Sequence, residues 1–299
     1  MDNIYTINKN ELPFLLQQIP DALEKLYVKG KMPKEDAKLL CVVGARKYSS
    51  YGEEACKKLL AGLAGYNICI VSGLALGIDS IAHRGAMETG LQTIAFPGSG
   101  LDPKVLYPPS HIRLAEEIVH SGGALISEFE MMQEGAPWTF PQRNRLMAGI
   151  SHATLVIEAE LISGTLITSK LATDYNRDVG AVPGQIFSPL SAGPHMLIRL
   201  GATPITSSQD ILEMLGLKAK EVVVQKELPL GLNENERKVM ELLQIEPHTS
   251  EQLVLKTGLE ARKINETVSS LEIGGIVKEI LGKIKIISPV SRYTYRSSR

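Results

Sequence analysis

The segment from Phe140 to Ser151 places two arginines, an amide and an aromatic ring directly before the apolar run ATLVIEA. A guanidinium group binds phosphate through paired hydrogen bonds, and an aromatic ring stacks on an unpaired base. Arg143 and Arg145 flank Asn144, and on a helix their side chains diverge by about 200°. We therefore expect one arginine to face a ligand while the other pairs inside the protein. The segment predicts a nucleic-acid contact, and no cluster of catalytic acids, bases or metal ligands accompanies it.

Each of these side chains also has a structural alternative. Either arginine could form a salt bridge to Glu128 or Glu158 instead of binding a phosphate. Phe140 is expected in a loop, where it could stack on a base or join the core, and Trp138 shares this ambiguity. The local sequence leaves both alternatives open.

Four more segments place small residues after an apolar run: GARKYSSYG, SGLALGIDSIAH, PGSG and SGTLIT. Free N–H groups of glycine turns and helix N-termini bind anions. A single turn of this kind could be an ordinary strand-to-helix connection with a capping hydroxyl, but several at one sheet edge favour a shared site. The residues expected to contact DNA are Gly44, Ala45, Arg46, Ser72, Gly73, Gly77, Gly98, Gly100, Phe140, Arg143, Asn144, Arg145, Ser163, Gly164, Thr165 and Thr168.

Other polar groups are expected to have structural roles. Asp79 should cap a helix N-terminus, and His83 should be a packed histidine because no acidic or cysteine partner has local spacing to it. The motif GxGxxG is absent, which argues against a dinucleotide, and we expect no cofactor. The three cysteines lack CxxC spacing, so we expect reduced core thiols and no metal site.

The elements that must position these residues follow from the hydrophobic pattern. Between 38 and 217, short apolar runs alternate with helix-length segments, which predicts a doubly wound, mainly parallel, Rossmann-like α/β sheet. Ligands bind such a sheet beyond the carboxyl ends of its strands. Residues 1–37 should form a short N-terminal extension packed on the sheet, residues 218–231 a linker and residues 232–299 a winged helix. In that tail, Thr249 or Ser250 should cap a helix and Gly258 should end it.

Bulk composition limits where a polyanion could bind. The 299 residues carry a net charge of -1, so no diffuse basic surface is expected and any such site must be local. No uncharged stretch reaches the roughly 18 residues of a membrane helix, and the N-terminus lacks a basic, apolar leader pattern. We expect a cytoplasmic protein with no membrane contact.

The motifs VGAR, SGLALGIDSIAH, TIAFPGSGLD, YPPS, SEF, FPQRNRLMAGIS, SGTLIT and AVPG occur in this order between about Leu12 and Leu215. Taken together, they resemble the DNA-processing protein A family (DprA, also called Smf). This resemblance implies a non-enzymatic protein that binds single-stranded DNA cooperatively and helps to load the RecA recombinase onto it during natural transformation. It also implies a DNA pocket containing Arg46, Phe140, Arg143 and Arg145.

The resemblance further implies a homodimer. Its contact would include Met196, Leu197, Ile198 and Leu200, although these residues could equally pack against the last strand. One departure concerns a basic residue that relatives often have directly after Tyr-Pro. Pro109 stands there, after spacing extended by residues 103–106, and Lys104 or Arg113 could replace the missing charge.

Two other functions are weighed. A phosphoribohydrolase-like, nucleotide-processing enzyme would need a PGGxGT turn and a catalytic glutamate, whereas this chain has PGSGLD. A winged-helix regulator of duplex DNA would need a basic recognition helix, and EARKINETVSSLEIGG offers only Arg262, Lys263 and Asn265. Both alternatives are weaker than single-stranded DNA binding.

Overall fold

The computed structural model describes residues 4–20, 23–218, 232–280 and 282–286. The chain divides into two compact units, residues 1–220 and 221–299, and each is described by itself. The predicted linker, residues 218–231, lies outside the described residues from 219 onward, as do residues 287–299 of the tail.

The first unit is built on one nine-stranded sheet with the order β1-β2-β6-β5-β4-β3-β7-β8-β9. Strands β3 to β9 run parallel, whereas β1 pairs antiparallel with β2, and β2 antiparallel with β6. The predicted mainly parallel α/β sheet is therefore confirmed. The strands are β1 (Ile4–Asn8), β2 (Lys25–Gly30), β3 (Lys38–Val43), β4 (Ile68–Ser72), β5 (Gln92–Ala95), β6 (Ala124–Ser127), β7 (Ala153–Val156), β8 (Asp178–Ala181) and β9 (Thr203–Pro204).

The N-terminal segment differs from its prediction. Its two strands do not pack on the sheet but extend it at one edge, where Tyr27 of β2 lies opposite Ser127 of β6. Leu26 and Val28, fully buried, join the core beneath this edge. Alternation of buried and half-buried residues along the first part of β2 suits a strand with one more deeply covered face.

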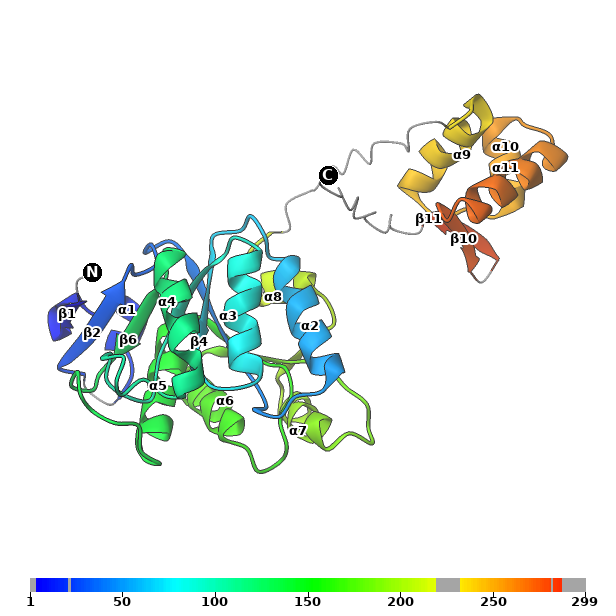
Figure 1. Ribbon diagram of the computed structural model, residues 1–299. Helices are drawn as coiled ribbons and strands as arrows, with labels where there is room; N and C mark the ends of the chain where they lie inside the picture. The colour runs from blue at the N-terminus through cyan, green and yellow to red at the C-terminus, as the bar shows by residue number, and fades with distance from the viewer. Residues whose placement is uncertain (1–3, 21–22, 219–231, 281, 287–299) are drawn as a thin grey trace. The chain divides into compact units, whose positions relative to one another are not determined.

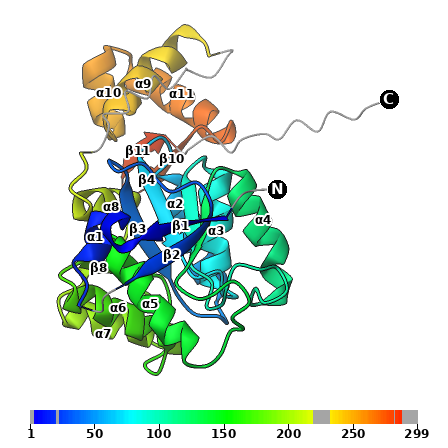
Figure 2. The ribbon, with the colours of Figure 1, turned by 90° about the vertical axis from the view of Figure 1, so that its left-hand side faces the viewer.

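Helices cover both faces of the sheet, as Figures 1 and 2 show. Helices α2, α3 and α8 share one apolar core with the sheet, and α4 packs beside α3; helices α1, α5 and α7, with Leu166 of α6, pack on the opposite core. The helices are α1 (Phe14–Gln17), α2 (Ser50–Ala61), α3 (Ile78–Glu88), α4 (Ile112–His120), α5 (Thr139–Ile150), α6 (Gly164–Asp174), α7 (Ala192–Arg199) and α8 (Ser208–Met214), with short 3-10 turns at Lys9–Glu11, Pro109–His111 and Pro189–Ser191.

The second unit contains three helices followed by a two-stranded hairpin: α9 (Glu234–Ile245), α10 (Ser250–Thr257), α11 (Ala261–Ile273), β10 (Val277–Ile280) and β11 (Lys283–Ile286). Thr249 caps α10 by accepting the Gln252 N–H, and Gly258 ends it with φ 71°, as predicted. Val239, Leu253 and Ile264, each no more than 1% exposed, centre a small core of their own. Among the described residues, no helix of the protein is long and apolar enough to cross a membrane.

His83 on α3 is a packed core histidine, as expected. Its side chain is fully buried, and its Nδ1 lies 2.7 Å from the Thr93 hydroxyl. Burial lowers the pKa of His83 from 6.5 to about 3, with smaller contributions from His111 and Arg143. The folded protein therefore excludes a proton that the unfolded chain binds.

We expect this exclusion to destabilise the fold in acid. As the pH falls from 6.5 toward 3, the unfolded state alone gains the proton, so His83 lowers the unfolding free energy by up to about 1.4 kcal/mol per pH unit. Urea unfolding across this range should show a shallower acid loss for His83→Gln than for wild type. The matched control is His120→Gln, at the exposed end of α4, which should keep the wild-type slope. Equal slopes for all three proteins would contradict the assignment.

Candidate nucleic-acid interface

A cavity of about 450 Å³ lies where the carboxyl ends of β3 and β7 meet. From β3 the chain runs through α2 to β4, and from β7 through α6 to β8, so the connections leave in opposite directions along the sheet. Ligands of doubly wound sheets bind at such a reversal of strand order. The predicted site residues that line the cavity are Gly44, Ala45, Arg46, Phe140, Arg143, Asn144, Ser163, Gly164, Thr165 and Thr168.

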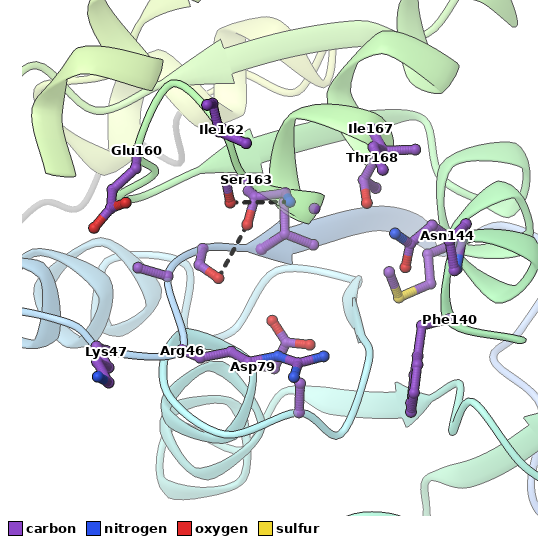
Figure 3. A pocket seen from close by; sticks show the side chains of 18 of the residues that line it. Arg46, Lys47, Asp79, Phe140, Asn144, Glu160, Ile162, Ser163, Ile167 and Thr168 are labelled. Carbon is purple, nitrogen blue, oxygen red and sulfur yellow. Dashed lines mark hydrogen bonds between the residues drawn. The ribbon is translucent and has the colours of Figure 1, made fainter. Parts of the chain in front are cut away.

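Arg46 lies in the turn between β3 and α2 and is exposed at the cavity rim (Figure 3). Its guanidinium carbon is 5.7 Å from the centroid of the Phe140 ring, within the range of a cation–π contact. Gly77, with φ 83°, allows this turn to pack tightly, because a Cβ there would lie 2.3 Å from the Ala45 carbonyl oxygen. The Arg46 side chain is therefore presented by a closely packed backbone.

Glu158 holds the far end of the same turn. Its carboxylate is buried and accepts hydrogen bonds from the backbone N–H of Ser49, at 3.0 Å, and from the Ser49 hydroxyl. The Ser49 hydroxyl in turn accepts the Gly52 N–H and caps α2. Glu158 is thus a structural carboxylate beside the site, and neither arginine of the RNR segment pairs with it.

Phe140 does not lie in a loop, as the sequence led us to expect, but in the first turn of α5. Its ring packs on Gly98, where a Cβ would come within 2.4 Å of a ring atom, and lies 5.6 Å from the ring of Tyr107. The side chain is half-buried and lines the cavity. The ring is therefore held in position with one part accessible to a ligand.

Arg143 is a structural residue rather than an exposed phosphate ligand. It is 5% exposed, and its guanidinium donates hydrogen bonds to the carbonyl oxygens of Gly73 and Phe96. Burial lowers its pKa, an effect that nearby Asp79 opposes. Arg143 thereby joins α5 to the segments that follow β4 and β5, beneath the cavity.

Asp79 is not the helix cap that the sequence predicts. Gly77 holds the N-cap position of α3, and Asp79 lies in the first turn, 6% exposed. Its carboxylate accepts the Gly73 N–H at 3.1 Å. Burial raises the pKa of Asp79, whereas the charge of Arg143 and backbone hydrogen bonds lower it. Asp79 and Arg143 both contact the Gly73 backbone, so the floor of the cavity is internally compensated.

Arg145 also turns inward, where it forms an ion pair with Glu128 that is about one-tenth exposed on both sides. The sequence predicted that one of the two arginines would pair internally, and the structure shows that both are engaged with the protein. Asn144, between them, is the residue of this triplet that is half-buried at the cavity wall. The exposed cations that line the cavity are instead Arg46, a predicted contact, and its neighbour Lys47, which was not among the predicted contact residues.

The start of α6 forms the opposite wall. Ser163 caps the helix by accepting the Thr165 N–H at 3.2 Å, and the Thr165 hydroxyl donates to the Gly44 carbonyl at 3.1 Å (Figure 3). Gly164 is exposed, with open space where a Cβ would project. The N-terminus of an eleven-residue helix therefore faces the cavity, and its dipole favours an anion there. Ile162, 97% exposed at this wall, carries no sequence signal that could have identified it.

Several predicted contact residues do not line the cavity, because their groups are used in packing. The Ser72 hydroxyl donates to the Val42 carbonyl, at 2.7 Å, and the Gly100 N–H donates to the Gln133 carbonyl, at 2.8 Å. The short side chain of Ser72 and the lack of a side chain at Gly100 each allow two backbone segments to approach closely. The residues corrected in this way are Ser72, Gly73, Gly77, Gly98, Gly100 and Arg145.

The four residues expected at a dimer contact are not equally accessible. Leu197 on α7 is 9% exposed and belongs to the core, and Met196 and Ile198 are half-buried against it. Leu200, directly after the helix, is 76% exposed. Leu197 therefore packs inside the protein and is not available to a second copy. Within the described residues, no group of three or more His, Cys, Asp or Glu side chains is placed to hold a metal ion.

Comparison with known proteins identifies relatives of this chain. Residues 3–216 match the family model of DNA recombination-mediator protein A. Protein Smf of Escherichia coli is 42% identical over 190 residues, which cover 64% of this chain and 50% of that protein. DNA processing protein DprA of Streptococcus pneumoniae is 40% identical over 200 residues, covering 67% of this chain and 70% of the relative.

Two of the solved structures that resemble the chain are those of DNA processing proteins. That of DprA from Streptococcus pneumoniae has a TM-score of 0.66 at 38% identity and covers 70% of this chain and 74% of its own. That of DNA processing protein A from Helicobacter pylori, a protein with a described single-stranded DNA binding mode, has a TM-score of 0.64 at 27% identity and covers 71% and 95%. The sequence match and the fold agree, and the chain belongs to the DNA recombination-mediator protein A family.

Proposed function

We propose that this protein binds single-stranded DNA in the cavity between β3 and β7, and that it acts on DNA by binding rather than by covalent chemistry. One observation carries the proposal: Arg46, exposed, lies over the ring of Phe140 and opposite the open N-terminus of α6. This arrangement offers two kinds of hydrogen-bond donor for phosphate groups, and one aromatic surface for a base, within a single small cavity.

The physical fit is better for a single strand than for a duplex. Phosphates can bind the guanidinium of Arg46 and the free N–H groups at α6, while a base reaches the Phe140 ring only if it is unpaired. The Helicobacter pylori relative supports the same ligand class. Asp79 and Arg143, which compensate each other beneath the cavity, keep the floor free of a net charge that would repel DNA.

We further propose the partners that family membership suggests: a second copy of the chain, with Leu200 at the contact, and the RecA recombinase, which the protein would help to load onto single-stranded DNA in natural transformation. Two joined sites would raise the effective concentration of one strand at the second site. The helices and hairpin of residues 232–286 are consistent with a winged helix, which we propose as an accessory domain.

The proposal is tested by equilibrium binding of labelled oligothymidine, with unlabelled single strands and duplexes of equal length as competitors. Single strands should compete strongly and duplexes weakly, and log K should fall with log salt by about 0.7 per neutralised phosphate. Equal competition by duplex DNA would contradict it. Release of free base from nucleoside monophosphates would point instead to the phosphoribohydrolase-like alternative.

Phe140→Ala should weaken oligothymidine binding by about 1–3 kcal/mol, the contribution of one base stacked on an aromatic ring. Phe140→Trp should retain most of the affinity, because it keeps a ring at the cavity wall. The control is Phe14→Ala on α1, which is 72% exposed and lies outside this cavity. Unchanged affinity in Phe140→Ala, with the fold intact, would remove the ring from the site.

A further inference from the structure

We propose that Tyr107 is a second base-stacking residue, which carries a DNA strand beyond the cavity, with Lys104 facing an adjacent phosphate. This inference rests on the proposed function and extends the same site. It concerns residues 96–108, between β5 and the 3-10 turn Pro109–His111, none of which lines the cavity.

The order of strands defines a path for the DNA. Along the carboxyl edge of the sheet, β7, β3, β4 and β5 are consecutive neighbours. The start of α6 follows β7, Arg46 follows β3, and Phe140 packs on Gly98, which follows β5. A strand that contacts the α6 start, Arg46 and Phe140 in this order therefore reaches Tyr107 next, because the rings of Tyr107 and Phe140 are 5.6 Å apart.

The Tyr107 ring is both accessible and fixed. Tyr107 is 46% exposed, and its ring is tilted by 55° from that of Phe140. Its neighbours on both sides, Leu106 and Pro108, are buried. His111, just beyond, is anchored by a hydrogen bond of 2.8 Å between its Nδ1 and the Leu74 carbonyl. A ring held in this way loses little conformational entropy when a base stacks on it, which is why tyrosine suits contact surfaces.

The charge beside Tyr107 points to Lys104 rather than Arg113. The Arg113 guanidinium is tied to Glu117 on α4, at 3.0 Å. Lys104 is exposed, and its backbone N–H donates to the Asp102 carboxylate at 2.9 Å, which fixes the turn that presents it. Of the two residues that could replace the basic group missing at Pro109, Lys104 is therefore favoured, because it is exposed three residues from the ring, whereas Arg113 is engaged with Glu117.

The size of the cavity gives a second reason to expect a contact outside it. A volume of about 450 Å³ is that of a small-molecule site. Proteins that hold single strands contact several successive nucleotides, through backbone charges and a series of stacked bases. The cavity alone can hold only a short part of a DNA strand. Tyr107 and Lys104 would bind the nucleotides that extend beyond it.

The test uses the full chain and oligothymidines of two classes, one short enough to fill only the cavity and one long enough to reach past Phe140. Tyr107→Ala should weaken binding of the long class by about 5- to 150-fold and leave the short class unchanged. Tyr107→Phe, which keeps the ring, should bind both classes like wild type. Lys104→Ala should lower the salt slope by about 0.7 for the long class alone. The control is Tyr5→Ala on β1, similarly exposed at 42%.

The outcomes separate this inference from the function on which it rests. If Tyr107→Ala binds long strands like wild type while Arg46→Ala does not, the stacking role is wrong and the proposed function stands. Equal losses for short and long strands would also overturn the inference, because Tyr107 would then act by positioning Phe140. Absence of binding to either class by wild type would overturn the proposed function itself.

Discussion

Replacing Arg143 by alanine is expected to lower the free energy of unfolding by about 3–5 kcal/mol, the range for breaking a buried charge pair by removing one partner. The substitution removes the donor to the carbonyl oxygens of Gly73 and Phe96, and it leaves the buried Asp79 carboxylate without its compensating charge. Urea denaturation measures the change. The expected loss is a large fraction of the roughly 5–15 kcal/mol by which a typical domain is stable.

Two variants control for this effect. Arg113→Ala removes an exposed arginine with an ion pair on α4 and should cost at most about 1 kcal/mol. The double variant Arg143→Met with Asp79→Asn should recover part of the lost stability, because no uncompensated buried charge remains. If Arg143→Ala unfolded like wild type but lost its DNA affinity, Arg143 would be a DNA ligand, as the sequence suggested.

Arg46→Ala is expected to weaken single-stranded DNA binding by roughly 10- to 100-fold, since a hydrogen bond to a charged group contributes about 1.5–3 kcal/mol. It should also flatten the dependence of log K on log salt by about 0.7, one neutralised phosphate. The folded state should be unaffected, because the Arg46 side chain is exposed and lies over the Phe140 ring at the cavity rim. Salt titrations of oligothymidine binding give both quantities.

Arg46→Lys distinguishes charge from geometry. Lysine keeps the charge and should restore the salt slope, but it lacks the planar, bidentate donor and should recover only part of the affinity. The matched control is Arg84→Ala on α3, a half-exposed arginine near Glu117 that does not line the cavity. An unchanged salt slope in Arg46→Ala would remove this residue from the site.

Much of the fold follows from the sequence because its signals are local. Apolar runs separated by helix-length segments specify a parallel sheet. The small residues that follow these runs predict turns at the carboxyl ends of the strands. The Thr249 cap and the Gly258 stop of the same helix are equally local and agree with the structure. The order of the turn motifs was also sufficient to indicate the family, which the comparison with known proteins confirms.

The use of each small residue could not be predicted in the same way. Gly98 and Gly77 were expected to turn their amides toward a ligand, yet one makes room for Phe140 and the other for the turn carrying Arg46. Both contacts join segments that are distant in the sequence. A glycine that admits a ligand and one that admits a neighbouring chain segment look alike until the packing is known.

The sequence by itself determined which groups gather at the sheet edge, because parallel strands of one sheet end at the same side. The tertiary structure alone decided which of them face the cavity. Helical spacing required Arg143 and Arg145 to diverge, but their partners, the Gly73 and Phe96 carbonyls and the Glu128 carboxylate, come from other elements of the sheet. A buried charge takes whatever partner the packing brings within reach, and this depends on contacts that no local pattern encodes.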